Sequence, residues 1–396
     1  MKQIAILGFG TVGGGVADIL ADSADLIAAS VGEPLALKKV LDLRDFPGNR
    51  FESLLTKNFE DILDDPDIAI VVECLGGKTF AYDYTKRLLA TGKSVITSNK
   101  DLVAAYGAEL LELAYQNKAH YLFEASVGGG IPIIRPLTHD LKANRIQEIY
   151  GILNGTTNYI LTGMTDKGST FEDTLRDAQQ LGYAEANPAS DVDGKDTANK
   201  VSILASLAFG KHVYPTAIPT EGIRSISDED ISLALSKGYH IKLIGRTTLN
   251  DDGSVYSYVA PHLVGENNML SGVNGVFNGI VVRGDQVGDV MFYGRGAGKY
   301  PTASAVVADV IDCAKTIDQP QPPLWVDGAA ISEGSEQESR WYVRAGETCN
   351  ASVFGAFDMI SASAFITKSM NQHDFIRALD IFKKTNTVVN ALRILD

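Results

Sequence analysis

Residues 181–200 hold four carboxylates and two lysines directly before an apolar stretch that is predicted to be helical. Asp196 and Lys200 stand four residues apart, so they share one face of that helix near its N-terminal end. Glu185 lies on the preceding loop, and loops often present functional groups. So much charge at the entrance of a core helix indicates binding or catalysis. The alternative, an N-cap formed by Asp193 or Asp196 and one surface ion pair, stays open on this pattern alone.

A second pattern with chemical meaning opens the chain. A short apolar run at residues 4–7 is followed by Gly8, Gly10 and Gly13 in the spacing GxGxxG, and then by a helical pattern. The first glycine makes the tight turn, the second lets the backbone approach a pyrophosphate, and the third allows close helix–strand packing. The helix N-terminus adds N–H groups for the phosphates. The segment predicts a dinucleotide site; a glycine-rich turn in another α/β fold is the alternative.

The composition of the 396-residue chain argues against several function classes. A net charge of −14 without a basic cluster opposes nucleic-acid binding, because a polyanion would be repelled. No apolar run approaches the ~20 residues that cross a bilayer, and we expect no signal peptide. Three widely spaced cysteines indicate reduced thiols, so we expect a cytoplasmic protein. The six histidines form no close ligand pair, which argues against a transition-metal centre.

Strand and helix patterns alternate over about the first 130 residues, which predicts an α/β fold with a Rossmann-like, doubly wound parallel sheet. Residues 35–43 form the expected second strand. An acid at its end would bind the ribose hydroxyls of NAD, whereas an arginine would accept the additional phosphate of NADP. The chain offers Asp42, Arg44, Asp45 and Arg50 there, so the preference stays open, with a lean towards NADP and NAD also accepted.

Three further segments resemble ligand-binding turns. Lys100 follows the predicted strand 94–97, at the strand end where open α/β sheets bind ligands; it is either a functional cation or a solvated loop charge. The glycines at 128–130 make either a cage of backbone groups for an ion or cofactor, or a tight strand-to-helix connection. A second glycine cluster at 294–298 precedes a predicted helix at 303–314, which indicates another close approach to an anion or cofactor.

Together these segments resemble the homoserine dehydrogenase family. Seven motifs follow the family's order over about residues 1–315: GFGTVG, VVECLGG, GKSVITSNK, FEASVGGGIPIIRPL, GILNGTTNYIL, LGYAEANPASDVDGKDTANK and GRGAGKYPTASAVVAD. The resemblance implies reversible hydride transfer between NAD(P)H and L-aspartate 4-semialdehyde, giving L-homoserine. The rival interpretations are another NAD(P)-dependent oxidoreductase acting on an amino-acid-derived aldehyde, and a non-catalytic NAD(P)-binding sensor.

The resemblance also implies roles for individual residues. Lys200 is the proton donor and acceptor at the substrate oxygen, and Lys100 is its companion near the nicotinamide. Glu185 and Asp196 hold the polar head of the substrate. The residues implied for the cofactor are Gly8, Phe9, Gly10, Thr11, Val12, Gly13, Arg44, Ser98, Lys100, Gly182, Gly296 and Gly298. Those implied for a sodium ion are Glu124 and the backbone carbonyls of Val127, Gly129 and Ile131.

We expect four regions in the chain. A Rossmann domain occupies residues 1–130, with the helix at 303–315 packed back on it, and an α+β catalytic and dimerisation domain occupies 131–317. A linker at 318–338 leads to a small α+β module at 339–396, with strands at 340–344, 360–367 and 388–395 and a helix at 372–384.

The C-terminal module resembles the second half of the βαββαβ ACT unit, which senses amino acids in many family members. Residues 345–359 carry no convincing first helix. We therefore expect a truncated ACT-like module with weak or absent inhibition by threonine, which serves instead as a contact within a homodimer.

Overall fold

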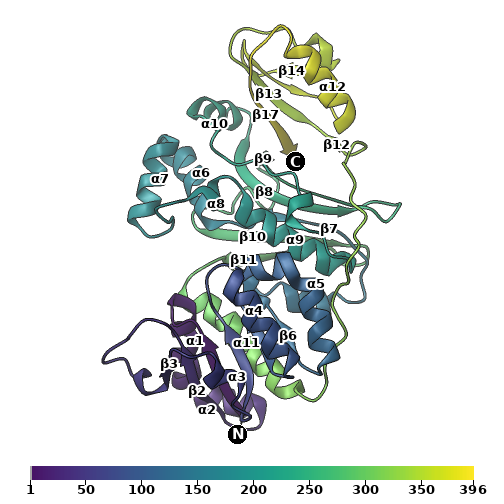
Figure 1. Ribbon diagram of the computed structural model, residues 1–396. Helices are drawn as coiled ribbons and strands as arrows, with labels where there is room; N and C mark the ends of the chain where they lie inside the picture. The colour runs from purple at the N-terminus through teal and green to yellow at the C-terminus, as the bar shows by residue number, and fades with distance from the viewer. Residues whose placement is uncertain (1) are drawn as a thin grey trace. The chain divides into compact units, whose positions relative to one another are not determined.

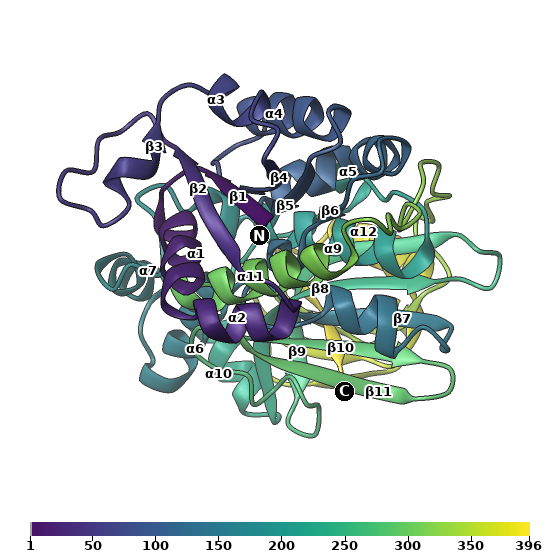
Figure 2. The ribbon, with the colours of Figure 1, turned by 90° about the horizontal axis from the view of Figure 1, so that it is seen from below.

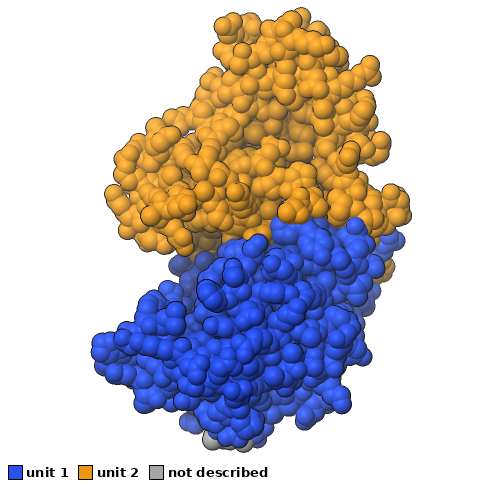
Figure 3. All heavy atoms as spheres, viewed as in Figure 1, with its two compact units in different colours: residues 1–145, 202–215, 294–329 blue, residues 146–201, 216–293, 330–396 orange. Residues whose placement is uncertain are grey.

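A computed structural model of the protein describes residues 2–396, and its contacts divide the chain into two compact units (Figure 3). The first unit consists of residues 1–145, 202–215 and 294–329. The second consists of residues 146–201, 216–293 and 330–396. Each unit is built on one large sheet.

The first unit contains a six-stranded parallel sheet in the order β3-β2-β1-β4-β5-β6. Its strands are β1 (Lys2–Leu7), β2 (Leu35–Leu41), β3 (Leu55–Thr56), β4 (Ile68–Glu73), β5 (Ser94–Thr97) and β6 (Tyr121–Leu122). The strand order reverses between β1 and β4, and ligands of doubly wound sheets bind in the crevice at such a reversal. The predicted Rossmann-like sheet is confirmed.

Helices cover both faces of this sheet (Figures 1 and 2). Figure 2 shows α1 (Thr11–Asp22), α2 (Ala24–Val31) and α11 (Lys299–Thr316) on one side of β1 and β2, with α3 (Glu60–Leu63), α4 (Thr79–Ala90) and α5 (Lys100–Gln116) on the other. Helix α11 arrives from far along the chain because it buries an apolar stripe with helical spacing, at Ala303, Val306, Val307 and Val310. That stripe shares a core cluster with β1 and α1.

The second unit contains a nine-stranded sheet in the order β11-β10-β7-β8-β9-β17-β13-β15-β14. Its strands are β7 (Ile146–Ile152), β8 (Tyr239–Leu249), β9 (Val255–Gly265), β10 (Phe277–Gly284), β11 (Gly288–Arg295), β13 (Trp341–Ala345), β14 (Phe357–Met359), β15 (Ala364–Thr367) and β17 (Val388–Leu395). The apolar patterns at residues 145–153, 238–247 and 255–263 predict β7, β8 and β9 within two residues at each end, as the pattern at 388–395 predicts β17. No pattern predicts β10 or β11.

Helices of the second unit accompany this sheet. They are α6 (Gly155–Lys167), α7 (Phe171–Gln180), α8 (Ala189–Val192), α10 (Asp228–Leu235) and α12 (Gln372–Phe382). Helix α9 (Lys195–Phe209) belongs to the second unit up to residue 201 and to the first unit beyond it. The charged segment of the sequence thus lies at the N-terminal end of α9.

The C-terminal strands continue the same sheet, since β17 pairs in parallel with β9 and antiparallel with β13. Around them lies a separate apolar cluster that includes Trp341, Phe354, Phe365 and Phe375. Between β13 and β14 the chain forms only a 3₁₀ turn, η5 (Ser352–Phe354), where an ACT unit has its first helix. The strand predicted at 360–367 begins only at Ala364, because residues 360–363 form a turn.

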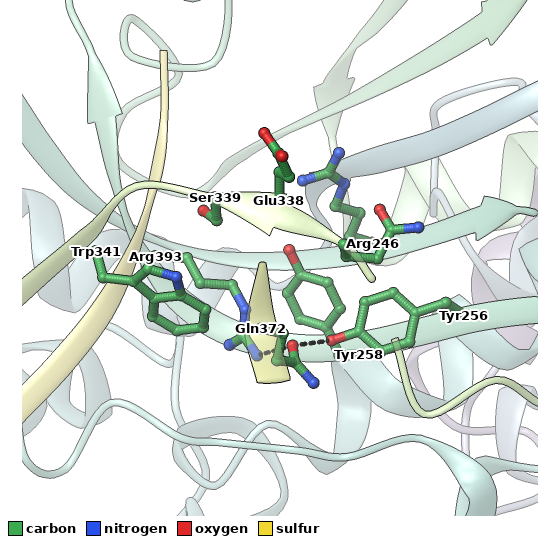
Figure 4. A pocket seen from close by; sticks show the side chains of 9 residues that line it. Arg246, Tyr256, Tyr258, Glu338, Ser339, Trp341, Gln372 and Arg393 are labelled. Atoms are coloured by element: carbon green, nitrogen blue, oxygen red, sulfur yellow. Dashed lines mark hydrogen bonds between the residues drawn. The ribbon is translucent and has the colours of Figure 1, made fainter. Parts of the chain in front are cut away.

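A small polar pocket marks the seam between β9 and the C-terminal strands (Figure 4). The guanidinium of Arg393 lies 4.5 Å from the ring centroids of both Tyr258 and Trp341. It also donates a 3.0 Å hydrogen bond to Gln372, whose side-chain oxygen accepts a second bond from Tyr256 at 2.7 Å. These cation–π contacts and hydrogen bonds join the C-terminal strands to the rest of the sheet.

No helix within residues 2–396 is both long enough and apolar enough to cross a membrane.

Candidate active site

Of the three glycines in the GxGxxG motif, only Gly10 has open space where a side chain would be. A Cβ on Gly8, whose φ is +92°, would lie 2.8 Å from the carbonyl oxygen of Cys74. A Cβ on Gly13 would lie 1.9 Å from the carbonyl of Gly8. Gly10, by contrast, has no atom within 4 Å of such a position, and it precedes α1 without a side-chain cap. Protein packing thus explains Gly8 and Gly13, whereas Gly10 leaves room for a phosphate at a helix N-terminus.

Asp42 and Arg44, which follow β2, are bound to each other. The side chain of Arg44 donates hydrogen bonds of 3.0 and 2.8 Å to the two carboxylate oxygens of Asp42. Asp42 also accepts a 2.8 Å bond from the backbone N–H of Phe9 in the glycine loop. The Arg44 guanidinium, with backbone donors, lowers the pKa of Asp42 to about 2. Asp42 and Arg44, the residues that could contact the ribose of the cofactor, therefore form an ion pair beside the glycine loop.

Buried polar contacts organise the ends of β4 and β5. Glu73 is fully buried and accepts a 2.5 Å hydrogen bond from the hydroxyl of Thr97. Burial raises the pKa of Glu73 to about 7, although these hydrogen bonds lower it. Asn99 caps α5 by accepting a 3.1 Å bond from an N–H of its first turn. Ser98 and Lys100, both predicted to contact the cofactor, flank Asn99 and are thus held at the carboxyl end of β5.

The two later glycine clusters of the sequence meet each other. The N–H of Gly130 donates a 3.1 Å hydrogen bond to the carbonyl of Arg295. A Cβ on Gly129 would lie 2.3 Å from the carbonyl oxygen of Gly296. At least part of the glycine requirement in both clusters therefore comes from this backbone-to-backbone contact, which a sequence pattern cannot reveal.

Glu124, predicted to hold a sodium ion, uses its carboxylate for backbone amides. One oxygen accepts from Ile133 and Ile134 at 2.7 and 2.9 Å, and the other accepts from Arg135 at 2.7 Å. The N–H of Glu124 in turn donates to the carboxylate of Asp309 at 2.7 Å. Burial raises the pKa of Asp309 to about 8. The Glu124 carboxylate therefore shapes the turn that follows it.

The turn after Glu124 is closed by its own backbone, since the N–H of Ile131 donates a 3.0 Å hydrogen bond to the carbonyl of Gly128. The carbonyl oxygen of Ile131 lies 2.4 Å from where a Cβ of Gly128 would be, so the turn has no room for a side chain at that position. Within residues 2–396 no group of three or more His, Cys, Asp and Glu side chains is placed to hold a metal. Any ion here would thus depend on carbonyl oxygens, the ligands that alkali cations take.

The charged segment of the second unit forms a buried ion pair. The Nζ of Lys200 donates a 2.8 Å bond to Oδ2 of Asp196 and a 2.7 Å bond to the carbonyl of Leu153. Lys200 is 8% exposed and Asp196 is 4% exposed. Asp196 and Lys200 therefore do not form the surface ion pair that was the alternative interpretation of the sequence. A surface ion pair does occur nearby, between Asp193 and Arg224. Desolvating two charges is costly, and a buried pair can serve either structure or function, so its place in the charged motif is what makes this pair the candidate active site.

Asn154 binds the same carboxylate, and the sequence analysis did not single it out. Its Nδ2 donates bonds of 2.7 Å to Oδ1 of Asp191 and 2.8 Å to Oδ2 of Asp196. Its position in the motif GILNGTTNYIL was the only available signal. Asn158 of the same motif has a different role, because its side chain donates to the backbone carbonyls of Val273 and Phe277 rather than to a carboxylate.

Glu185 and Gly182 lie on the loop that follows α7. Gly182 ends the helix with a φ of +74°, and Glu185 is exposed. The hydroxyl of Thr156, in the first turn of α6, donates a 2.6 Å bond to the carbonyl of Tyr183. This bond fixes the loop on α6, the helix that Asn154 caps.

Comparison with known proteins shows to which family the chain belongs. A family model described as homoserine dehydrogenase matches residues 132–311, and one described as its NAD binding domain matches residues 8–124. The homoserine dehydrogenase of Synechocystis sp. is 48% identical over 316 residues, which are 78% of this chain and 72% of that protein. The chain belongs to the homoserine dehydrogenase family.

Solved structures of homoserine dehydrogenases share the fold. A crystal structure of the enzyme from Thiobacillus denitrificans has a TM-score of 0.91 and 34% identity, covering 100% of this chain and 98% of that one. A hyperthermophilic archaeal homoserine dehydrogenase in complex with NADPH has a TM-score of 0.67 and 29% identity, covering 81% of this chain and 100% of that one.

The protein is therefore an NAD(P)-dependent oxidoreductase that acts on a CH–OH group. As a homoserine dehydrogenase it interconverts L-aspartate 4-semialdehyde and L-homoserine. The two rival functions, a different oxidoreductase and a non-catalytic sensor, are not favoured.

Proposed function

We propose that Lys200 donates the proton to the substrate oxygen during reduction and accepts it during oxidation. When bound, the nicotinamide cofactor supplies or takes up the hydride. An ammonium has three N–H donors, and Lys200 uses two of them on Asp196 and Leu153. The third can stabilise the negative charge that develops on the aldehyde oxygen and then neutralise it. The buried pair of Asp196 and Lys200 is the observation that carries this proposal.

We propose that Lys100 assists at the nicotinamide and that carboxylates select the substrate. L-Homoserine carries an α-ammonium, which Glu185 and Asp196 would bind as anions. Of these two, Asp196 is already bonded to Lys200, whereas Glu185 is exposed and lies on a loop. Glu185 would therefore act mainly in binding, and Asp196 in both binding and proton transfer.

We infer that NADP is preferred and that NAD is also accepted. The residues proposed to hold the cofactor are Gly8, Phe9, Gly10, Thr11, Val12, Gly13, Arg44, Ser98, Lys100, Gly182, Gly296 and Gly298. The open space at Gly10 suits the pyrophosphate, and Arg44, which lies beside the glycine loop, is the residue proposed for the additional phosphate. The NADPH complex of the archaeal relative supports this choice.

We also propose a sodium site formed by Glu124 with the backbone carbonyls of Val127, Gly129 and Ile131. The family resemblance of the motif FEASVGGGIPIIRPL supports it. The ion would stiffen the turn that meets the second glycine cluster.

The family resemblance further supports a cytoplasmic homodimer. The single 3₁₀ turn between β13 and β14 supports weak or absent inhibition by threonine. Strong inhibition by millimolar threonine would refute that part of the proposal.

The deciding experiment follows absorbance at 340 nm with L-homoserine and either NADP or NAD between pH 7 and pH 10. We expect oxidation that increases towards alkaline pH, because the lysine must be neutral to accept a proton. Lys200→Ala should lower kcat by about 10²- to 10⁴-fold while cofactor affinity is unchanged. Lys195→Ala is the matched control, since Lys195 is exposed on the first turn of the same helix. Full turnover by Lys200→Ala would exclude the assigned role.

A further inference from the structure

Asn154 uses both ends of its side chain in the second unit. The amide nitrogen donates to Asp191 and Asp196, at 2.7 and 2.8 Å. The amide oxygen accepts from the N–H and the hydroxyl of Thr157, at 2.8 and 3.0 Å, and thereby caps α6. With 5% of its surface exposed, the side chain is enclosed by these partners.

Asn154 and Lys200 bind the same oxygen atom. Oδ2 of Asp196 accepts one hydrogen bond from the Asn154 amide and one from the Lys200 ammonium. The residue before Asn154, Leu153, presents its carbonyl to that ammonium. Leu153 and Asn154, which directly follow β7, therefore contact Lys200 and Asp196, respectively.

The chemistry of an amide suits this position. Asp191 and Asp196 are like charges that would repel each other, and a primary amide offers two N–H donors that bridge them without adding charge. A carboxylate at position 154 would have no donor, and a hydroxyl has only one. The hydrogen bonds also compete with Lys200 for the lone pairs of Asp196, so they affect how strongly the lysine holds its proton.

We propose that Asn154 is a positioning residue of the reaction: it fixes Asp196 against Lys200, holds Asp191 beside it, and so sets where and how readily Lys200 exchanges its proton. This inference rests on the proposed role of Lys200. Capping of α6 is a second, separable task of the same side chain, because it uses the oxygen and not the nitrogen.

The test separates the two tasks by substitution. In Asn154→Ser the hydroxyl oxygen can still cap the helix, since serine is a good N-cap residue, but the double donor is lost. We expect kcat for homoserine oxidation to fall by about 100-fold, as small misplacements of reacting groups do, with the KM for NADP unchanged. Asn371→Ser, which replaces the cap of α12, is the control and should behave as wild type.

A second variant reports on proton transfer rather than on folding. Asn154→Asp keeps the size and the capping oxygen but places a third carboxylate next to Asp196. The alkaline rise of homoserine oxidation should then shift to higher pH, because the added charge stabilises the ammonium of Lys200. A helix cap without an electrostatic role would not move this profile.

The outcomes are distinct. If wild type does not oxidise homoserine, the proposed function fails before the inference is reached. If wild type is active and Asn154→Ser keeps its kcat, or Asn154→Asp keeps the wild-type pH profile, Asn154 only caps the helix and the inference is wrong. Should Asn154→Ser fail to fold, as judged by circular dichroism, the pH profile of Asn154→Asp decides alone.

Discussion

Two carboxylate–cation pairs of similar geometry occur in different surroundings. In the first unit Arg44 binds Asp42 at 2.8 Å with 63% of the arginine side chain exposed. In the second unit Lys200 binds Asp196 at the same distance, but only 10% of the lysine side chain and 6% of the aspartate are exposed. In the first pair only Asp42 is buried, with 9% of its side chain exposed, so water can take over the contacts of the exposed arginine when the pair opens. The second pair cannot be broken without stranding a buried charge, because both partners are buried. The exposed pair can thus open to admit a ligand, and the buried pair must act intact.

A third pair shows that burial alone does not indicate catalysis. Arg344 and Asp230 are 6% and 0% exposed, and Asp230 also accepts a 2.9 Å bond from the hydroxyl of Tyr342. Although burial raises the pKa of Asp230, hydrogen bonds from Arg344 and Ser227 lower it below its usual value. These partners satisfy the carboxylate completely. The pair joins α10 to β13.

The largest effect should come from breaking this structural pair. Arg344→Met should lower the free energy of unfolding by about 3–5 kcal/mol, because Asp230 would remain buried without its cation. The variant should keep the wild-type kcat where it is folded. Urea unfolding and steady-state assays measure the two quantities. Arg340→Met, which removes the exposed pair with Asp396, is the control and should cost less than about 1 kcal/mol.

Breaking the proposed catalytic pair should lower kcat, which breaking the structural pair leaves unchanged. Asp196→Asn keeps the shape but removes the charge that faces Lys200, and we expect kcat to fall by about 100-fold. Steady-state oxidation of homoserine measures this loss. Asp193→Asn, which breaks the neighbouring surface pair with Arg224, should leave kcat unaffected. Equal losses in the two variants would mean that the buried pair has no special role.

The exposed pair should affect cofactor choice alone. Arg44→Ala should raise the KM for NADP by about tenfold, the loss of one exposed phosphate contact, and should leave the KM for NAD nearly unchanged. Parallel assays with both cofactors measure the ratio. Lys57→Ala, which removes another exposed cation of the same unit, is the control and should leave the ratio of the two KM values unchanged. A loss that is the same for both cofactors would argue against a phosphate contact by Arg44.

The smallest effect concerns pH. Because the pKa of Asp42 is lowered to about 2, its ion pair contributes stability that is fully present above the unfolded pKa of about 4 and is lost as pH falls through about 2. The exposure of Arg44 limits this contribution to less than about 1 kcal/mol. The difference in unfolding free energy between wild type and Asp42→Asn should therefore narrow between about pH 4 and about pH 2. If this difference in unfolding free energy does not change with pH, the ion pair between Asp42 and Arg44 does not stabilise the fold.

Local patterns in the sequence predicted what local physics decides. The GxGxxG loop, the strands β7 to β9 and the pairing of Asp196 with Lys200 follow from spacing within a few residues. Strand β17 was predicted at its exact limits, since its apolar residues alternate. Helix α11 was predicted because its apolar stripe has helical spacing.

Contacts between distant residues could not be predicted in the same way. Asn154 meets Asp191 and Asp196 across 37 and 42 residues, and nothing in its own neighbourhood indicates this. The meeting of Gly129 with Gly296 is similarly remote. Strands β10 and β11 were missed, and β11 is partly exposed along its length, so its sequence lacks a strong apolar signal.

The position of β17 has a consequence for how the chain is made. This strand, residues 388–395, lies between β9 and β13 inside the nine-stranded sheet, although it is the last strand in sequence. During synthesis the edge of β9 stays unpaired until these residues have left the ribosome, and an unpaired edge invites association with other chains. A chain that ends before residue 388 would therefore expose the edge of β9 and should associate with other chains more readily than the full chain does.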